Sequence, residues 1–255
     1  MPIFAQERLN SIKRFVRKHR RMTFAELQKH IEVSPATLRR DLSELEQSGD
    51  VIRVHGGILD PAYVRSEVSF DERLVRNRAA KAAIAVAAGK LVPAGATVLV
   101  DAGSTCLEAG KVLLGRKDVR LITHSVALLG AAFRGEADII CLGGELRKVS
   151  GALTGSQALG SLNCLHADIA FIGASGIEPE WGCATTDLSE TEMKRALLAR
   201  SARKVLLADL TKWNSPSTVR FAEWKEFDDW IVDKMPPQAE LKALRKSDVK
   251  IRQAG

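Results

Sequence analysis

Apolar residues in the first sixty positions follow a helical spacing and then a strand spacing. They recur every three or four residues over 6–18 and from 34 to about 49, with a shorter apolar stripe between. Residues 51–54 alternate as a strand does, a Gly-Gly pair makes a tight turn, and 58–59 begin a return strand. Three helices followed by a hairpin is the order of a winged helix-turn-helix, which we predict for residues 1–59.

Two of these helices have recognisable starts. Thr23 is followed three residues later by Glu26, which is the pattern of a capping box. Ser34 is a good N-cap because its hydroxyl accepts from an exposed N–H of the first turn. Pro35 then occupies the first helical position, where a missing N–H is harmless. We therefore expect the second helix to begin after Thr23 and the third after Ser34.

The third predicted helix has two different faces. Leu38, Leu42 and Leu45 give it a buried face, and the opposite face starts with small and polar residues and continues with two arginines. A helix that enters the major groove of DNA needs such a face, and a basic hairpin beside it suits the backbone or the minor groove. We interpret it as a DNA-recognition helix, with candidate contacts from Ser34, Ala36, Thr37, Arg39, Arg40, Arg53 and His55.

Beyond residue 77 helices alternate with apolar strands. Residues 60–77 show little periodicity and are expected to be a linker. Strands are predicted at 97–101, 119–123, 138–142, 168–173, 205–209 and 230–232, and helices at 78–91, 105–114, 125–133, 156–162 and 188–201. Several strands are apolar throughout, as strands buried on both faces are. The alternation predicts an α/β domain over 78–255 with a mostly parallel sheet.

Small and polar residues follow four of these strands, at 101–105, 123–125, 143–144 and 173–176. One such loop is an ordinary strand-to-helix turn. The carboxyl ends of parallel strands, however, meet at one edge of a sheet, and ligands bind there. Four such loops at one edge favour a site for a small polar ligand.

Candidate ligand-binding side chains can be selected at that edge. Amides at a helix N-terminus suit an anion, and three nearby cations either neutralise a phosphate or are solvated surface residues. His124 is an acid/base group or a hydrogen-bond donor, although a lone histidine is more often structural. Four aspartates bind sugar hydroxyls or cap helices: Asp101, Asp168, Asp187 and Asp209. The candidate set is Asp101, Gly103, Ser104, Thr105, Thr123, His124, Ser125, Gly143, Gly144, Arg147, Gly173, Ser175, Gly176, Asp187, Lys194 and Lys212.

The amino-acid composition restricts the possible partners and cofactors of the protein, but it does not identify its function. The net charge of +7 and the pI near 9.4 suit a polyanionic partner. The first sixty residues, however, hold eleven basic and eight acidic side chains, so charge alone does not decide for DNA. The four cysteines and five histidines are scattered, so we expect no metal and no cofactor. No apolar run approaches the roughly 20 residues that cross a bilayer, and we expect a cytoplasmic protein without a membrane partner.

These motifs resemble the DeoR family of bacterial sugar-metabolism regulators over nearly the whole chain. The N-terminal signature runs from Ser34 to Gly57 and contains TLRRDL and IRVHGG. The C-terminal motifs are DAGST at 101–105, THS at 123–125, GGE at 143–145, the DIAFIGASGI run at 168–177, TD at 186–187 with Lys194, and DLTK at 209–212.

The resemblance implies a fold and a mode of action. The larger domain is expected to have the fold of ribose-5-phosphate isomerase and CoA transferases and to sense a phosphorylated sugar or sugar acid. Bound effector is expected to loosen the grip on operator DNA, which makes a repressor of a carbohydrate-utilisation operon. Because one DNA-binding module offers little area, we expect a homodimer or homotetramer on repeated half-sites.

The chain departs from the family pattern at two positions. Members often have Thr-Asn-Ser where this chain has His124 between Thr123 and Ser125, which bears on effector preference. The related isomerases carry a catalytic glutamate directly before the lysine that Lys194 resembles, and here that position is Met193. Binding without turnover, with no catalytic residue, is therefore the better interpretation. An isomerase-like enzyme and a transcriptional activator stay open as alternatives.

Overall fold

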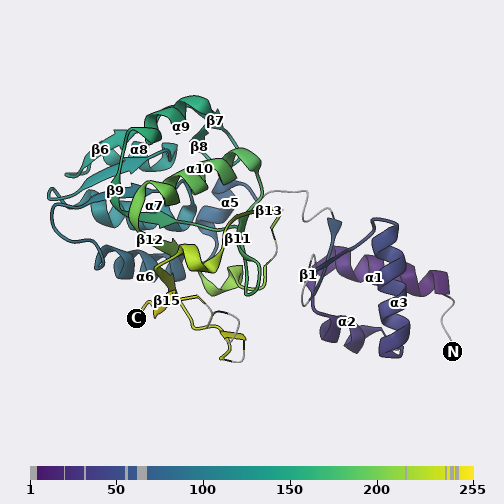
Figure 1. Cartoon of the computed structure of the whole chain (residues 1–255). Helices are drawn as coiled ribbons and strands as arrows, with labels where there is room; N and C mark the ends of the chain where they lie inside the picture. The colour runs from purple at the N-terminus through teal and green to yellow at the C-terminus, as the bar shows by residue number, and fades with distance from the viewer. Residues whose placement is uncertain are drawn as a thin grey trace. The chain divides into compact units, whose positions relative to one another are not determined.

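The structure is a computed structural model with two compact units, Met1–Glu67 and Val68–Gly255, called here the N-terminal unit and the C-terminal unit (Figure 1). It describes residues 5–19, 21–31, 33–54, 57–61, 68–215, 217–238, 240–241, 244 and 247–255. Within this part of the chain, every helix is too short or too polar to span a lipid bilayer.

Three helices and a small antiparallel sheet form the N-terminal unit. The helices are α1 (Ala5–His19), α2 (Phe24–His30) and α3 (Pro35–Gln47). The strands, in the order β1-β3-β2, are β1 (Arg21–Met22), β2 (Ile52–Val54) and β3 (Gly57–Leu59). The winged helix-turn-helix prediction is confirmed. Strand β1 is an addition, because two residues are too few to show an alternating pattern.

Both predicted helix starts are confirmed. The Thr23 hydroxyl accepts from the Glu26 N–H at 3.1 Å, and the Glu26 carboxylate accepts from the Thr23 N–H at 2.8 Å. The Ser34 hydroxyl accepts from the Thr37 N–H at 3.2 Å, and Pro35 begins α3. Local sequence therefore fixes where α2 and α3 begin.

A buried ion pair joins α1 to α3. Arg8 Nε lies 2.5 Å from Asp41 Oδ2, and Arg8 Nη2 lies 3.0 Å from Asp41 Oδ1. The two side chains are 10% and 4% exposed. The hydrogen bond to Asp41 raises the pKa of Arg8 above its ordinary value. The apolar pattern does not reveal this pair, since charged side chains are rarely buried.

The prediction of a linker over residues 60–77 is wrong for its second half, which contains a helix. Helix α5 (Phe70–Val75) begins after Ser69, whose hydroxyl accepts from the Glu72 N–H at 3.3 Å. Phe70 and Leu74 pack against the core of the C-terminal unit. A six-residue helix is too short for a visible period, and tertiary packing stabilises it. Residues 62–67 lie outside the described part.

A seven-stranded sheet forms the centre of the C-terminal unit. Its order is β15-β14-β12-β9-β4-β5-β6, and every neighbouring pair is parallel. The strands are β4 (Thr97–Val100), β5 (Arg120–Thr123), β6 (Asp138–Cys141), β9 (Ala167–Ile172), β12 (Ser201–Leu207), β14 (Asp229–Val232) and β15 (Lys250–Gln253). All but β15 match the predicted strands. Strand β15 is a mostly exposed edge strand and lacks an apolar run.

Helices cover both faces of this sheet (Figure 1). Val98 and Val100 point to a core shared with α6 (Arg78–Gly89), α7 (Ser104–Leu114) and α8 (Val126–Ala132). Leu99, between them, points to the core shared with α9 (Ser156–Asn163) and α10 (Leu188–Ala199). The two-sided burial explains why the central strands are apolar throughout.

Several short elements complete the C-terminal unit. They are the hairpin β7 (Glu145–Arg147) and β8 (Ala152–Thr154), a sheet of β10 (Gly176–Glu178), β11 (Gly182–Thr185) and β13 (Val219–Ala222), and the 3-10 turns η1 (Leu210–Lys212) and η2 (Trp224–Glu226). The sequence analysis predicted none of them, because three- and four-residue strands barely exceed the signal of a loop.

Candidate functional site

The exposed face of α3 carries most of the predicted DNA contacts. Ser34, Ala36, Arg39 and Arg40 are exposed, and Thr37 is partly buried. The hydroxyl oxygens of Ser34 and Thr37 lie 2.8 Å apart, so the cap and the first turn are held together. The start of α3 thus presents small and polar groups, followed by two arginines.

Neighbouring elements position two of the predicted arginines. The guanidinium carbon of Arg39 lies 5.3 Å from the ring centroid of Phe24 in α2, a cation–π contact. Arg53 on β2 donates to Ser43 Oγ at 3.1 Å and lies 3.8 Å from a Glu46 oxygen, which joins the strand to α3. His55 lies outside the described residues.

Topology brings the four predicted loops to one edge of the sheet. Strands β9, β4, β5 and β6 are consecutive parallel neighbours, so the loops that follow them leave the sheet at its carboxyl edge. Asp168 does not belong there. It lies near the start of β9, where its Oδ2 accepts from the Thr97 N–H at 2.8 Å. Asp168 therefore braces the opposite edge.

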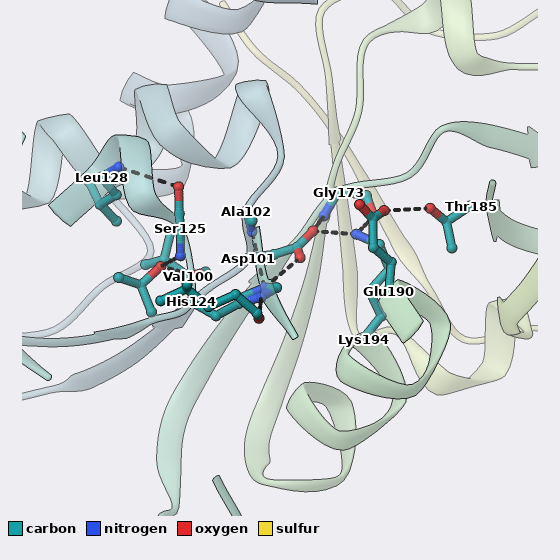
Figure 2. A network of polar contacts seen from close by, with 12 residues as sticks. Val100, Asp101, Ala102, His124, Ser125, Leu128, Gly173, Thr185, Glu190 and Lys194 are labelled. Atoms are coloured by element: carbon teal, nitrogen blue, oxygen red, sulfur yellow. Dashed lines mark hydrogen bonds and ion pairs between the residues drawn. The ribbon is translucent and has the colours of Figure 1, made fainter. Parts of the chain in front are cut away.

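Asp101 is the centre of a buried polar network at the carboxyl edge (Figure 2). Its Oδ2 accepts from Lys194 Nζ at 2.5 Å and from the Gly173 N–H at 2.9 Å. Its Oδ1 lies 3.1 Å from His124 Nε2. Lys194 also donates to the Gly173 carbonyl at 3.0 Å. One carboxylate therefore links the loops after β4, β5 and β9 to α10.

Both ring nitrogens of His124 have partners, and Nε2 has two alternative ones. Its Nδ1 lies 3.0 Å from the Leu153 carbonyl oxygen, which can only accept, so Nδ1 carries a proton. Nε2 lies 3.2 Å from the Ala102 N and 3.1 Å from Asp101 Oδ1. A neutral ring accepts from Ala102, and a charged ring donates to Asp101. His124 is buried, and it docks the β7–β8 hairpin against the loop after β4.

The buried charges of Asp101 and Lys194 stabilise each other. Burial alone raises the pKa of Asp101, but the charge of Lys194 and the hydrogen bond with His124 outweigh it, so the pKa lies below its ordinary value. Burial alone lowers the pKa of Lys194, but Asp101 and Glu190 outweigh it, so that pKa is raised. Both groups are therefore ionised at neutral pH, and Asp101 already compensates the charge of Lys194.

Arg147 belongs to a second network beside the first. Its Nη1 lies 3.1 Å from Glu190 Oε1, and its Nε lies 3.4 Å from Asp187 Oδ1. The other Glu190 oxygen accepts from the Thr185 hydroxyl at 3.0 Å. Asp187 also caps α10 by accepting from the Glu190 N–H. Two carboxylates thus compensate Arg147, and sequence reasoning did not select Glu190 or Thr185.

Other predicted residues have local structural roles at the same edge. Thr123 donates to the Val100 carbonyl at 2.7 Å, and Ser125 caps α8 by accepting from the Leu128 N–H. Ser104 and Thr105 form the buried first turn of α7, whose N-cap Gly103 offers no side chain. Gly176 lies in β10, and the Ser175 N–H donates to the Ala184 carbonyl. Gly143 and Gly144 have φ angles of 71° and 109°.

Gly144→Ala is expected to destabilise the C-terminal unit by about 2 kcal/mol. An added Cβ would lie 2.4 Å from the Thr154 carbonyl oxygen, and the positive φ disfavours any side chain. Gly130→Ala is the matched control, because it lies in α8 and, beyond its chain neighbours and the backbone of its own helix, no atom lies within 4 Å of the added Cβ. The control should gain about 0.5–1 kcal/mol. Urea unfolding measures both, and equal stability of the two variants would contradict the assignment.

Lys212 is separate from both networks. It is partly buried on η1, and no hydrogen bond or ion pair reaches its Nζ from the described residues. The charges of Asp209, Arg73, Arg76 and Lys81 interact with that of Lys212. The sequence analysis selected neither Arg73 nor Lys81. Arg73 falls in the expected linker, and Lys81 looks like a solvated position in an alanine-rich helix.

Residue types that bind metals are dispersed over the described part of the chain. No group of three or more His, Cys, Asp or Glu side chains is placed there to hold a metal ion. All four cysteines are free thiols: Cys106 and Cys183 are buried, and Cys141 and Cys164 are exposed.

A winged helix-turn-helix joined to a parallel α/β unit with a polar strand edge defines a two-part DNA-binding transcriptional regulator. A DeoR-like helix-turn-helix domain matches residues 8–61, and a DeoR C-terminal sensor domain matches residues 76–234. The chain belongs to the DeoR family.

Named relatives match almost end to end. The HTH-type transcriptional regulator GolR of Listeria innocua is 31% identical over 98% of this chain and 99% of that protein. The HTH-type transcriptional repressor GlcR of Bacillus subtilis is 32% identical over 98% of this chain and 96% of that protein. The glycerol-3-phosphate regulon repressor of Escherichia coli is 27% identical over 96% and 97%.

Solved structures are similar only at a distance. Ribose 5-phosphate isomerase A of Methanocaldococcus jannaschii is 22% identical, with a TM-score of 0.41, over 54% of this chain and 55% of that chain. Ribose 5-phosphate isomerase A of Neisseria gonorrhoeae is 15% identical, with a TM-score of 0.40, over 60% and 57%.

Proposed function

We propose that this protein is a repressor of a carbohydrate-utilisation operon. Its N-terminal unit binds operator DNA, and a phosphorylated sugar or sugar acid at the carboxyl edge of the C-terminal unit releases it. The observation that carries the proposal is the exposed face of α3, capped by Ser34 and bearing Arg39 and Arg40. Relatives named as repressors, including one for a glycerol-3-phosphate regulon, support the sign of the effect.

Helix α3 enters the major groove in this proposal. Ser34, Ala36 and Thr37 lie at its start, where a recognition helix meets base edges and phosphates. Arg40 is exposed and contacts guanine or phosphate, whereas Arg39 is steered by its stack on Phe24. Arg53 reaches the backbone or the minor groove from β2, as does His55. Operator DNA as the partner places the protein in the cytoplasm.

The strand-edge residues hold the effector. An effector releases DNA only if it binds the DNA-free state more tightly than the DNA-bound state. The Asp101 network supplies a rigid frame at this edge, and the loops after β4, β5, β6 and β9 supply amides and hydroxyls. A homodimer or homotetramer on repeated half-sites would provide the binding area that one small module lacks.

Binding without turnover is favoured over isomerase chemistry. The residue before Lys194 is Met193, which is fully buried in an apolar core and offers no base. Glu190, the nearby carboxylate, is bound by Arg147 and Thr185. A general base needs a basic atom that can reach the substrate proton. Met193 has none, and each oxygen of Glu190 already accepts from a neighbouring side chain.

Arg40→Ala is expected to weaken binding to the protein's own promoter about tenfold, since one arginine contact to DNA is worth roughly 1–3 kcal/mol. If Arg40 contacts phosphate, the slope of log affinity against log salt falls by about 0.9. If Arg40 contacts a base instead, the ratio of the affinity for the promoter to the affinity for random duplex DNA falls. Fluorescence anisotropy at several salt concentrations measures both quantities.

The control for this experiment is Arg134→Ala, which removes the same charge from an exposed position of the C-terminal unit. It should bind the promoter as the unmodified protein does. Equal losses of promoter affinity in the two variants would mean that Arg40 acts only through the net charge of the protein. An unmodified protein without preference for its promoter over random duplex would overturn the proposed function.

A further inference from the structure

Helix α8 has no polar side chain. Residues 126–133, which are the helix and its C-cap Phe133, read VALLGAAF. A helix that is apolar on all sides is normally buried on all sides. In α8, Leu128 is fully buried and three alanines pack partly against the core, whereas the opposite side is exposed. This exposed side has the composition of a covered surface.

The exposed side of α8 carries an apolar stripe, called here the α8 stripe. Its members are Val126, Leu129 and Phe133, which are spaced by three and four residues and so lie on one side of the helix. Val126 is 41% exposed, Leu129 is partly buried, and Phe133 is 92% exposed. The same spacing forms the seam between two packed helices in a coiled coil.

The turn of the β7–β8 hairpin extends the α8 stripe at one end. The Val126 N–H donates to the Gly151 carbonyl at 3.0 Å, so this turn lies beside the start of α8. Val149, in the same turn, is 41% exposed. An apolar side chain from a second element therefore adjoins the Val126 end of the stripe.

Charges of opposite sign flank the two ends of the α8 stripe. Glu136 follows Phe133 by three residues, and Lys148 lies in the hairpin turn at the Val126 end. Both side chains are exposed, and among the described residues neither has an ion-pair partner. Arg134 also lies at the Phe133 end, so the position of Glu136, rather than the net charge of that end, carries the match described next.

Two α8 helices packed antiparallel about a twofold axis satisfy both features. The middle of the stripe lies next to Leu129, so an axis there places Phe133 of each copy over Val126 of the other. The same rotation brings Glu136 of each copy towards Lys148 of the other. A surface of this kind is self-complementary, which an interface between two identical chains requires.

We propose that the α8 stripe is an interface between two copies of this chain, with Phe133 as its anchor. Aromatic side chains are enriched at the apolar centre of interfaces, around which a polar rim lies. The stripe supplies such a centre, and Glu136 and Lys148 belong to the rim. The inference rests on the proposed function for the need of a second copy, and it deepens that function by naming the surface that joins the copies.

The first test measures the association of the full chain by sedimentation equilibrium at several protein concentrations. The unmodified protein should associate. Phe133→Glu should raise the dissociation constant about a hundredfold, since each dimer loses two anchors and gains two unpaired charges. Leu188→Glu is the matched control, because Leu188 is 69% exposed on α10 and receives the same charge. The control should associate as the unmodified protein does.

Thermal unfolding of the same proteins separates association from folding. The melting temperature of the unmodified protein should rise with protein concentration, because association stabilises the folded state. At the lowest concentration, where the copies are separate, Phe133→Glu and Leu188→Glu should melt at similar temperatures, since exposed side chains contribute little to the fold. A much lower value for Phe133→Glu would mean that Phe133 stabilises a single copy, which contradicts the proposal.

A charge exchange tests the antiparallel arrangement. Glu136→Lys and Lys148→Glu should each weaken association about tenfold, because each sets two pairs of like charges against one another in the dimer. The double variant carries both changes in every copy and should associate nearly as well as the unmodified protein. Losses that simply add in the double variant would overturn this interface.

Promoter binding shows which proposal fails. If the unmodified protein is monomeric, or if Phe133→Glu associates equally well, the interface fails and the α8 stripe is covered by another part of the chain or by a different partner. A promoter preference in that case leaves the repressor assignment standing. If the protein associates through the α8 stripe but does not prefer its promoter over random duplex, the proposed function fails and the interface stands.

Discussion

Asp101→Asn is expected to destabilise the C-terminal unit by about 3–5 kcal/mol, the usual effect of breaking a buried ion pair. The substitution keeps the shape of the side chain but removes the carboxylate charge that contacts Lys194, which is 6% exposed. It also weakens the bonds that link the Gly173 loop and His124 to the loop after β4. Urea unfolding should show a midpoint far below that of the unmodified protein.

A double variant checks that charge is the cause. Asp101→Asn with Lys194→Met removes both charges, and it should be more stable than the sum of the two single effects predicts by about 1–3 kcal/mol. Strictly additive losses would mean that the two side chains act independently. Such a result would contradict the network shown in Figure 2.

The stability of the C-terminal unit should also depend on pH in a direction that the Asp101 ion pair determines. The pKa of Asp101 is lower in the folded protein than in the unfolded chain, where it is about 3.9. Its stabilising contribution is therefore complete above about pH 4 and is lost as the pH falls below that value. The unmodified protein should lose stability on acidification more steeply than Asp101→Asn does. Parallel profiles below pH 4 would contradict the assignment.

Arg8→Met is expected to destabilise the N-terminal unit by about 3 kcal/mol. Asp41 is left buried at 4% side-chain exposure, and the bond that fixes α3 on α1 disappears. A unit of this size has a small core and little stability to lose. The melting temperature of this unit should fall by more than about 10 °C, and promoter binding should weaken with it.

Arg17→Met is the matched control on the same helix. Arg17 is 65% exposed and lies 3.9 Å from Asp50, so its removal should change stability by less than about 0.5 kcal/mol. Adding Asp41→Asn to Arg8→Met should restore part of the lost stability, because no unpaired carboxylate then remains buried. Comparable losses for Arg8→Met and Arg17→Met would show that the Arg8–Asp41 pair contributes no more than a surface contact.

The sequence by itself determined the elements whose information is local. Thr23 with Glu26, and Ser34 with Pro35, set where α2 and α3 begin, since a cap acts within one turn. The six predicted strands of the central sheet were recognisable because burial on both faces demands an unbroken apolar run. Parallel order then implied that the loops after β9, β4, β5 and β6 share one edge.

Tertiary structure alone decided which charged groups are buried and which partners they meet. Asp41 lies 33 positions from Arg8 along the chain, and Lys194 lies 93 positions from Asp101. No local pattern reveals such pairs, because a charged residue reads as solvated until a distant partner compensates its burial. The sequence analysis also did not predict the short strands β1 and β15 or the short helix α5. Their stability comes from what they pack against rather than from their own sequence.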